Sequence, residues 1–319
     1  MTAIKSYFKG LGIAWNSKRM TLLLYILLLI FSFIVLIPFF GVLKKEIGYS
    51  MSVYPLLKDF DYTVYTDFLQ HSGKALKPFV SIGIWLSVFY ILFGVFLSGG
   101  IIHIIYNEEN KFSLKEFFAG CGNYVLPFFR VTVFSFILQA IIAILVYTPL
   151  MAYLGSLKET AESEATLVYT FLTGAAIHLI LAAFVMLITD YAKIMLVVNE
   201  SKKSFVSIWL SLKFFFRYFF RVIFIYVLLL ILPVAFMAGY FLFSQQFSIM
   251  SKQSFVIVVS VQQIFMLMRI WFKIWFFGSE ITLLTETLGI EKQNESNEEW
   301  DVHALEVVED EIEIDPDEL

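Results

Sequence analysis

The chain has a single cysteine, Cys121, and few charged side chains. A lone cysteine has no partner for an internal disulfide, so the sequence excludes a disulfide-bonded framework. Charged residues make up only 16% of the sequence, whereas about 25% is usual in soluble globular proteins. Hydrophobic residues make up 59%, and several apolar runs reach the length of about 20 residues that a spanning helix needs. The sequence therefore predicts an all-α, polytopic membrane protein.

Motifs that carry chemistry are also missing. The sequence contains no G-x-S-x-G, no H-E-x-x-H and no glycine loop of the phosphate-binding kind. The four histidines, at positions 71, 103, 178 and 303, are dispersed and have no cysteine or acidic residue at ligand spacing. We therefore expect no metal, no cofactor, no enzymatic activity and no nucleic-acid partner.

Six apolar runs predict six spanning helices, at about residues 20–43, 79–105, 128–151, 167–198, 217–243 and 255–277. The alternative for the first run is a secretory signal peptide. That run is about twice as long as a usual signal core, and it ends without an A-x-A-like cleavage site. We assign residues 20–286 to the transmembrane domain. Paired glycines at 99 and 100, in the second run, indicate either a close helix crossing or a kink.

Residues 1–19 combine four basic residues with an apolar stripe. The stripe follows the spacing i, i+3, i+4, i+7 and i+11, and its members are Ile4, Tyr7, Phe8, Leu11 and Trp15. This spacing puts the apolar side chains on one face of a helix. We predict an N-terminal helix that lies in the headgroup layer of the membrane.

The distribution of lysine and arginine predicts the orientation. The N-terminus, 106–130 and 199–221 hold four, three and five basic residues, whereas 152–165 and 244–254 hold one each. The longer connection 44–77 holds five, offset by four acidic residues. Because cytoplasmic loops are enriched in basic residues, we expect a multi-pass protein of the inner (plasma) membrane with both termini in the cytoplasm.

The sequence repeats itself. Residues 113–131 align without a gap with residues 204–222, and both stretches end in Phe-Phe-Arg-Val. More weakly, 7–12 resembles 117–122. We infer three units, each with an interfacial elbow helix (113–122 and 204–216 in the second and third units) followed by a transmembrane hairpin. Such a repeat predicts pseudo-threefold symmetry about the membrane normal; the alternative is chance similarity between apolar, Phe-rich segments.

Four ionisable residues lie within the predicted spans: Asp190, Lys193, Arg269 and Lys273. Asp190 and Arg269 lie about 12 Å and about 13 Å from the ends of their predicted helices, at about 1.5 Å per residue. Because an isolated charge in hydrocarbon costs at least about 2.5–3.5 kcal/mol, we predict an ion pair between Asp190 and Arg269. Lys193 and Lys273 would reach the inner interface. The cluster is either a structural pin or part of a pathway.

Basic and aromatic residues alternate after the fourth predicted span. We predict a basic collar at the inner leaflet, which consists of Lys202, Lys203, Lys213, Arg217, Arg221 and Arg130. Attraction to anionic lipid is worth about 1 kcal/mol per basic residue near the surface. The alternative is an ordinary set of positive flanks without specific lipid binding.

Other polar residues lie near the predicted helix ends. Acidic residues at 108, 109, 200 and 280 would form a cytoplasmic acidic ring or, as we prefer, solvated helix ends. Gln262, Gln263 and His178 lie near the outer ends, and we ascribe them to hydration at the loop edges.

The C-terminal tail, 287–319, is expected to be disordered. From Glu291 onward it holds thirteen acidic residues and one lysine, a net charge of −12, while residues 1–290 carry +8. Partial alternation of apolar and acidic residues in 306–315, from Glu306 to Asp315, predicts a segment that a cytoplasmic partner could take up as a strand. A simple solvated tail is the alternative.

The stretch Asp190-Tyr191-Ala192-Lys193, followed by an elbow and an aromatic-basic helix start, resembles a loose group of six-span bacterial inner-membrane proteins. This group includes the membrane domains found beside glycerophosphodiester phosphodiesterases. The resemblance covers about residues 1–286 and implies a helical membrane domain. It carries over no catalysis, because this sequence has no phosphodiesterase domain.

Together these patterns predict a non-enzymatic membrane module that organises membrane lipids or partner proteins at the inner leaflet. The alternative is a transporter with a polar path near Asp190 and Arg269.

Overall fold

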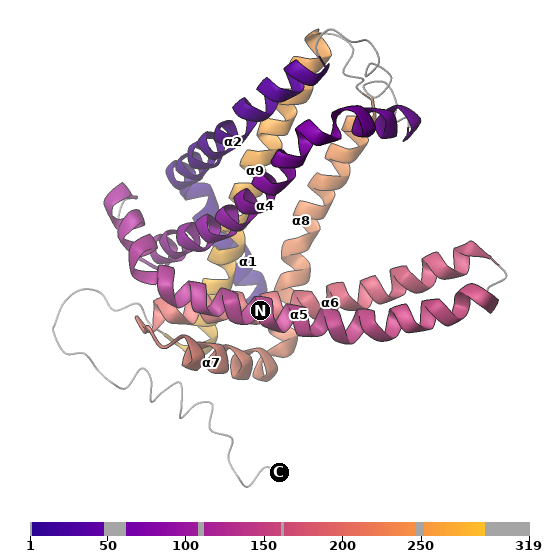
Figure 1. The fold of residues 1–319 in the computed structure, drawn as a ribbon. Helices are drawn as coiled ribbons and strands as arrows, with labels where there is room; N and C mark the ends of the chain where they lie inside the picture. The colour runs from indigo at the N-terminus through magenta and orange to yellow at the C-terminus, as the bar shows by residue number, and fades with distance from the viewer. Residues whose placement is uncertain (1, 48–61, 108–111, 161–162, 247–251, 291–319) are drawn as a thin grey trace. The chain divides into compact units, whose positions relative to one another are not determined.

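The computed structural model is all-α and describes residues 2–47, 62–107, 112–160, 163–246 and 252–290 (Figure 1). Its helices are α1 Thr2–Asn16, α2 Lys18–Ile47, α4 Tyr62–Tyr106, α5 Leu114–Thr160, α6 Glu164–Val198, α7 Ser204–Arg217, α8 Phe219–Gln246 and α9 Lys252–Leu288. Six of these, all except α1 and α7, contain a stretch long and apolar enough to cross a membrane. The all-α class is confirmed, as is the prediction of six helices that are long and apolar enough to cross a membrane. The tail from residue 291 lies outside the described residues.

The chain divides into two compact units. The first contains residues 1–94 and 223–283, and the second contains residues 95–222 and 284–319. Helix α4 contributes to both units, as do α8 and α9.

Aromatic stacking joins neighbouring helices of the first unit. Phe31 of α2 stacks on Phe89 of α4 with ring centroids 5.6 Å apart, and Phe236 of α8 stacks on Phe265 of α9, also at 5.6 Å. Such pairs stabilise contacts by about 0.5–1.5 kcal/mol beyond area burial. Helices α2 and α4, and helices α8 and α9, therefore form two packed pairs.

Helix α1 packs on α9 through small residues. Trp275 Nε1 donates a hydrogen bond of 3.1 Å to the Tyr7 carbonyl, and Gly10 lies so close to Ser279 that a Cβ at position 10 would overlap it. The buried residues of α1 are all small: Ala3, Ser6, Gly10 and Ala14. Small residues let two helix backbones approach closely, which is a common basis of helix association in membranes.

The apolar stripe predicted for the N-terminal helix is consequently divided: Tyr7 packs against Trp275 of α9, with ring centroids 4.8 Å apart, while three other members lie on the outside. Phe8 and Trp15 are each 62% exposed, and Ile4 is 49% exposed. The helix itself is confirmed, whereas its place in the headgroup layer stays a prediction.

In the second unit, α5 and α6 lie side by side along most of their length (Figure 1). The Gln139 side chain donates from Nε2 to the Ala182 carbonyl at 3.1 Å. Nearer the connection between the two helices, Gly174 of α6 faces the Leu150 side chain of α5 so closely that a Cβ at position 174 would not fit without movement. An interhelical hydrogen bond and a close contact therefore fix the register of this pair.

The paired glycines near the end of α4 lie where this helix crosses the start of α5 at close range. A Cβ on Gly100 would lie 2.6 Å from both Cys121 Sγ and the Phe117 carbonyl oxygen. One turn further along α4, a Cβ on Gly120 of α5 would lie 2.7 Å from His103 Cβ. Of the two alternatives for this glycine pair, the structure supports close approach.

Three boundaries differ from the sequence-based prediction. The elbow 113–122 is continuous with the third span in α5, which runs through Pro127, whereas Tyr218 separates α7 from α8. Helix α4 already begins at Tyr62, inside the predicted connection 44–77. Helix α9 continues beyond residue 277 to Leu288, and its hydroxyls bond within the helix, as Thr282 does to the Gly278 carbonyl at 2.7 Å.

The α1–α9 crossing predicts opposite effects for two nearby glycines. Gly10→Ala should lower stability by about 1–3 kcal/mol, because the added methyl overfills the contact with Ser279. A Cβ on Gly12 would have no neighbour within 4 Å, so Gly12→Ala should be neutral or raise stability by up to about 1 kcal/mol through helix propensity. Thermal unfolding in mild detergent measures both, and equal effects of the two substitutions would contradict the crossing.

Candidate functional site

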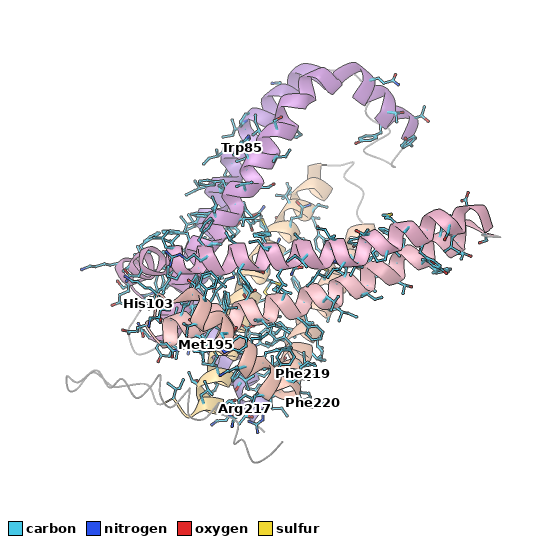
Figure 2. All side chains as sticks on the ribbon, turned by 60° about the horizontal axis from the view of Figure 1, so that its bottom comes forward. Trp85, His103, Met195, Arg217, Phe219 and Phe220 are labelled. Carbon is cyan, nitrogen blue, oxygen red and sulfur yellow. The ribbon has the colours of Figure 1, made fainter. Side chains whose placement is uncertain are left out.

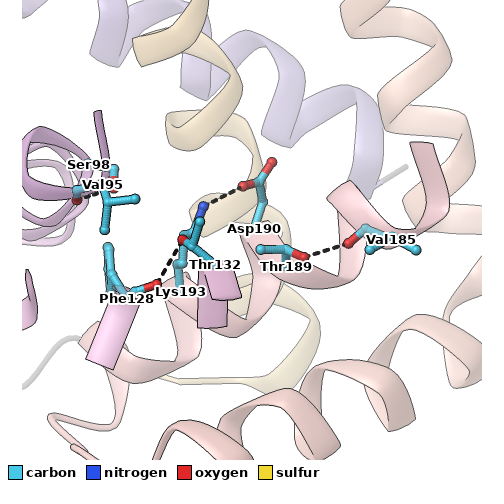
Figure 3. A network of polar contacts seen from close by, with 8 residues as sticks. All are labelled: Val95, Ser98, Phe128, Thr132, Val185, Thr189, Asp190 and Lys193. Carbon is cyan, nitrogen blue, oxygen red and sulfur yellow. Dashed lines mark hydrogen bonds and ion pairs between the residues drawn. The ribbon is translucent and has the colours of Figure 1, made fainter. Parts of the chain in front are cut away.

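The predicted polar cluster centres on an ion pair within α6 (Figure 3). Lys193 Nζ lies 3.6 Å from Asp190 Oδ1, and each side chain is 14% exposed. The residues between them, Tyr191 and Ala192, are fully buried. A largely buried carboxylate and ammonium neutralise each other at this separation, which reduces the cost of placing both in a spanning helix.

Hydroxyl groups of three helices lie in the same polar region (Figure 3). Each hydroxyl donates to a carbonyl of its own helix, at 2.7 or 2.8 Å; the pairs are Ser98 with Val95, Thr132 with Phe128, and Thr189 with Val185. Each of these donors is thus satisfied within its own helix.

The two basic members of the cluster on α9 belong to the first unit. Arg269 and Lys273 have exposed side chains there, and Lys273 Nζ lies 6.0 Å from the centroid of the Phe277 ring. Because α9 ends at Leu288, Arg269 lies about 28 Å from the helix end by the helical rise. The distance from Arg269 to the end of its helix therefore differs from the about 13 Å used to match it with Asp190, and the ion pair between the two residues stays a prediction.

Sequence reasoning misjudged two polar residues of α9. Gln263, ascribed to loop-edge hydration, accepts a hydrogen bond of 2.7 Å at Oε1 from the hydroxyl of Tyr25 on α2. Glu280, interpreted as a solvated helix end, is only 1% exposed. The error at Glu280 follows from a helix that continues beyond its predicted apolar run to Leu288, whereas the error at Gln263 follows from a contact with another helix. The hydrogen bond between Tyr25 and Gln263 could have been suspected from the sequence, because each is a polar residue within an apolar run.

The collar begins where α6 ends. The Ser201 and Glu200 amides donate to the carbonyls of Leu196 and Val197, both at 3.1 Å, which is the hydrogen-bond pattern of a Schellman motif. Glu200 occupies the left-handed position, with φ +44°, where glycine is usual. The Ser201 hydroxyl oxygen then accepts from the Lys203 amide at 3.1 Å. These bonds set the direction in which α7 leaves the elbow.

One group of collar residues lies where α7 meets α5. The Ser204 hydroxyl donates to the Pro127 carbonyl at 3.2 Å, and this bond places the start of α7 one turn from Arg130. Arg130, Lys202 and Lys203 are all exposed. The structure thus brings these three basic residues to one junction.

A second group lies at the other end of α7. The guanidinium carbons of Arg217 and Arg221 lie 5.8 Å and 5.5 Å from the centroid of the Tyr218 ring, within the range of a cation–π interaction. Arg217 and Phe220 lie together at this junction of α7 and α8 (Figure 2). Lys213 is half-buried one turn before Arg217. The collar therefore consists of two basic groups separated by the length of α7, about 21 Å.

Helix α7 repeats the arrangement of α1. Its buried face is largely serine and phenylalanine: Ser204, Ser207, Leu210, Ser211, Phe214 and Phe215. Its outer face carries large aromatic residues, since Phe205 is 75%, Trp209 59% and Phe216 68% exposed. Both short helices thus pack through one face and leave an aromatic face, flanked by basic residues, uncovered by the described residues of their own unit.

No family model, no curated protein and no solved structure matches this chain.

The Asp190–Lys193 contact predicts energetic coupling. Asp190→Asn and Lys193→Gln should each lower stability, and the double variant should lose less than the sum, with a coupling energy of about 0.5–3 kcal/mol. A double-mutant cycle from detergent unfolding measures this coupling. Asp190→Asn combined with Lys202→Gln is the matched control and should be additive within about 0.5 kcal/mol. Additivity in both cycles would contradict an energetically coupled ion pair.

The conformation of Glu200 predicts a stabilising substitution. Glu200→Gly should raise the unfolding temperature, because the left-handed position costs a side-chain-bearing residue about 1 kcal/mol. Asn199 has an ordinary φ of −90°, so Asn199→Gly is a control that should leave stability unchanged or lower it. A loss of stability in Glu200→Gly would show that the Glu200 side chain makes a compensating contact.

Proposed function

We propose that this chain is a non-enzymatic, multi-pass module of the bacterial inner (plasma) membrane that gathers anionic lipid at the inner leaflet. Both termini would lie in the cytoplasm, as the distribution of basic residues predicts. The resemblance to six-span bacterial inner-membrane proteins is part of this proposal. The observation that carries it is the pair of short helices α1 and α7, whose aromatic faces are exposed beside basic residues.

Three equivalent units are part of the proposal, and the tight glycines support it. In the aligned segments, Gly10 corresponds to Gly120 and Gly12 to Gly122. The first glycine of each pair lies against a neighbouring helix, and the second has nothing within 4 Å of a Cβ position. In the third segment the aligned residue is Ser211, which is fully buried. A small residue packed at the same aligned position in all three segments supports a repeat over chance similarity between Phe-rich segments.

The order of packing also supports a pseudo-threefold arrangement. The start of α5 packs on the end of α4, and α7 packs on α6, so each elbow contacts the second helix of the hairpin before it. Helix α1 precedes the first hairpin, and it packs on α9, the second helix of the last one. Each of the three short elbow segments thus contacts the second helix of a hairpin, which supports three equivalent units.

Lipid is the partner that suits the outer faces of α1 and α7. Aromatic side chains such as Phe8 and Trp209 fit the boundary between headgroups and acyl chains, and lysine and arginine beside them attract anionic headgroups. Lys18, at the start of α2, lies 5.1 Å from the centroid of the Trp15 ring of α1, so a basic and an aromatic group are adjacent there as they are around Tyr218. The role in organising partner proteins through residues 306–315 remains a separate part of the proposal.

Neutralising the collar tests the function. The chain with Lys202, Lys203, Arg217 and Arg221 changed to glutamine should bind short-chain phosphatidylglycerol at least about tenfold more weakly, since each basic residue contributes about 1 kcal/mol. Calorimetric titration of the protein in phosphatidylcholine nanodiscs measures the affinity. Short-chain phosphatidylcholine is the ligand control, and its binding should not change.

Lys44→Gln is the matched protein control, because Lys44 is exposed at the far end of α2 and would face the other side of the membrane. Equal phosphatidylglycerol affinity of the collar variant and the unchanged chain would overturn the lipid role. A proton or solute flux in liposomes that disappears in Asp190→Asn would instead support the transporter.

A further inference from the structure

The basic collar has more positive charge than its surroundings neutralise. Five of its six residues are exposed, and Lys213 is half-buried. Arg217 and Arg221 contact the Tyr218 ring, but no collar residue forms an ion pair with a carboxylate among the residues that the structure describes. A partner of opposite charge is therefore missing from the described part of the chain.

The same chain carries such a partner in its sequence. Residues 291–319 hold a net charge of −12, twice the positive charge of the six collar residues. These acidic residues follow each other closely, and attraction between them and the collar depends on charge density more than on a fixed conformation. The tail is thus opposite to the collar in the sign of its charge and carries more than enough charge to neutralise it.

The start of the tail is anchored in the unit that holds the collar. Residues from 284 onward belong to the second unit with α7, and Leu284 and Leu288 are buried, at 0% and 7% exposure. The Ile290 amide donates to the Thr285 carbonyl at 3.0 Å, and Gly289 adopts φ +65°. This glycine-capped helix end fixes where the tail leaves α9.

The collar lies within reach of that point. Residues 291–319 can extend over at most about 100 Å at about 3.5 Å per residue. The longest helix of the same unit, α5, is about 70 Å long by the helical rise. A tether of this kind gives an effective concentration in the millimolar range for its own binding site.

We propose that the acidic tail, residues 291–319, binds the basic collar of its own chain and thereby competes with anionic lipid for it. This inference rests on the proposed lipid function. The anionic inner leaflet repels the tail, because the surface potential there is about −30 mV. The tail therefore occupies the collar when anionic lipid is scarce and is displaced when anionic lipid is abundant. The collar is in this way an electrostatic switch that its own chain controls.

The first experiment changes only the charge of the tail. In the full chain, all thirteen acidic residues of 291–319 are changed to the corresponding amides, and phosphatidylglycerol binding is titrated in phosphatidylcholine nanodiscs. We expect the affinity to rise at least about fivefold, because the competitor is removed. A tail with the same residues in scrambled order should behave like the unchanged chain, since its charge is kept. Unchanged affinity in the amide variant would overturn the competition.

The second experiment measures the contact without lipid binding as its readout. Spin labels on Val206→Cys, an exposed position of α7, and on Ala304→Cys report their separation by pulsed EPR. Cys121 is fully buried, and the unchanged chain serves as its labelling control. Short distances should be present at low salt and lost in about 1 M salt, where the screening length is about 3 Å. The short distances should also be lost in the amide variant. Distances that stay the same both in high salt and in the amide variant would overturn the proposal.

The two experiments separate failure of this inference from failure of the lipid function. If the amide-tail chain binds phosphatidylglycerol no better than phosphatidylcholine, the lipid function fails, and the EPR result still decides the tail contact. If lipid binds but the distances are insensitive to tail charge, the tail inference alone fails. Dilution of labelled protein with excess unlabelled protein should preserve the short distances. Their loss would assign the contact to a second copy and overturn a contact within one chain.

Discussion

Close crossings of helices at small residues determine the rest of this structure. Gly10 lies against Ser279, and Gly120 lies against His103. In a membrane, lipid tails are as apolar as the helices, so burial of apolar side chains gives little preference for helix contact. Close approach of backbones then contributes the van der Waals contacts that hold helices together. Small residues occupy the buried side of α1, and the aromatic side chains of Phe8 and Trp15 lie on its exposed side.

The same division into a packed face and an exposed face places aromatic and basic side chains together on α7. On α7 the serine-rich face contacts the protein, and Phe205 and Trp209 remain exposed beside Lys202 and Lys203. Aromatic rings and basic groups are thus presented together to the surroundings of the helix. Such a surface fits the headgroup layer of an anionic membrane, where apolar and charged contacts are both satisfied.

Charge is divided between the interior of the second unit and its collar. Asp190 and Lys193 pair within one helix, where both are largely buried, so their charges cancel locally. The collar residues lie at least partly exposed and lack carboxylate partners among the described residues. A paired buried charge contributes to holding the helix in place, whereas an unpaired exposed charge attracts partners from outside. These two arrangements suit a structural role for the α6 pair and a binding role for the collar.

The sequence by itself determined that the protein is all-α, that six helices are candidates to cross a membrane, and that 204–216 is a short helix with basic residues around it. Composition and apolar length decide these features, because backbone groups in hydrocarbon must bond within their own helix. Only the tertiary structure decided that Phe8 and Trp15 of α1 are exposed, that Tyr25 bonds to Gln263, that α5 is continuous through Pro127, and that Glu280 is buried in a helix that continues to Leu288. Side-chain periodicity reveals that a helix has an apolar face, but which face contacts a neighbour depends on where small residues allow two backbones to meet.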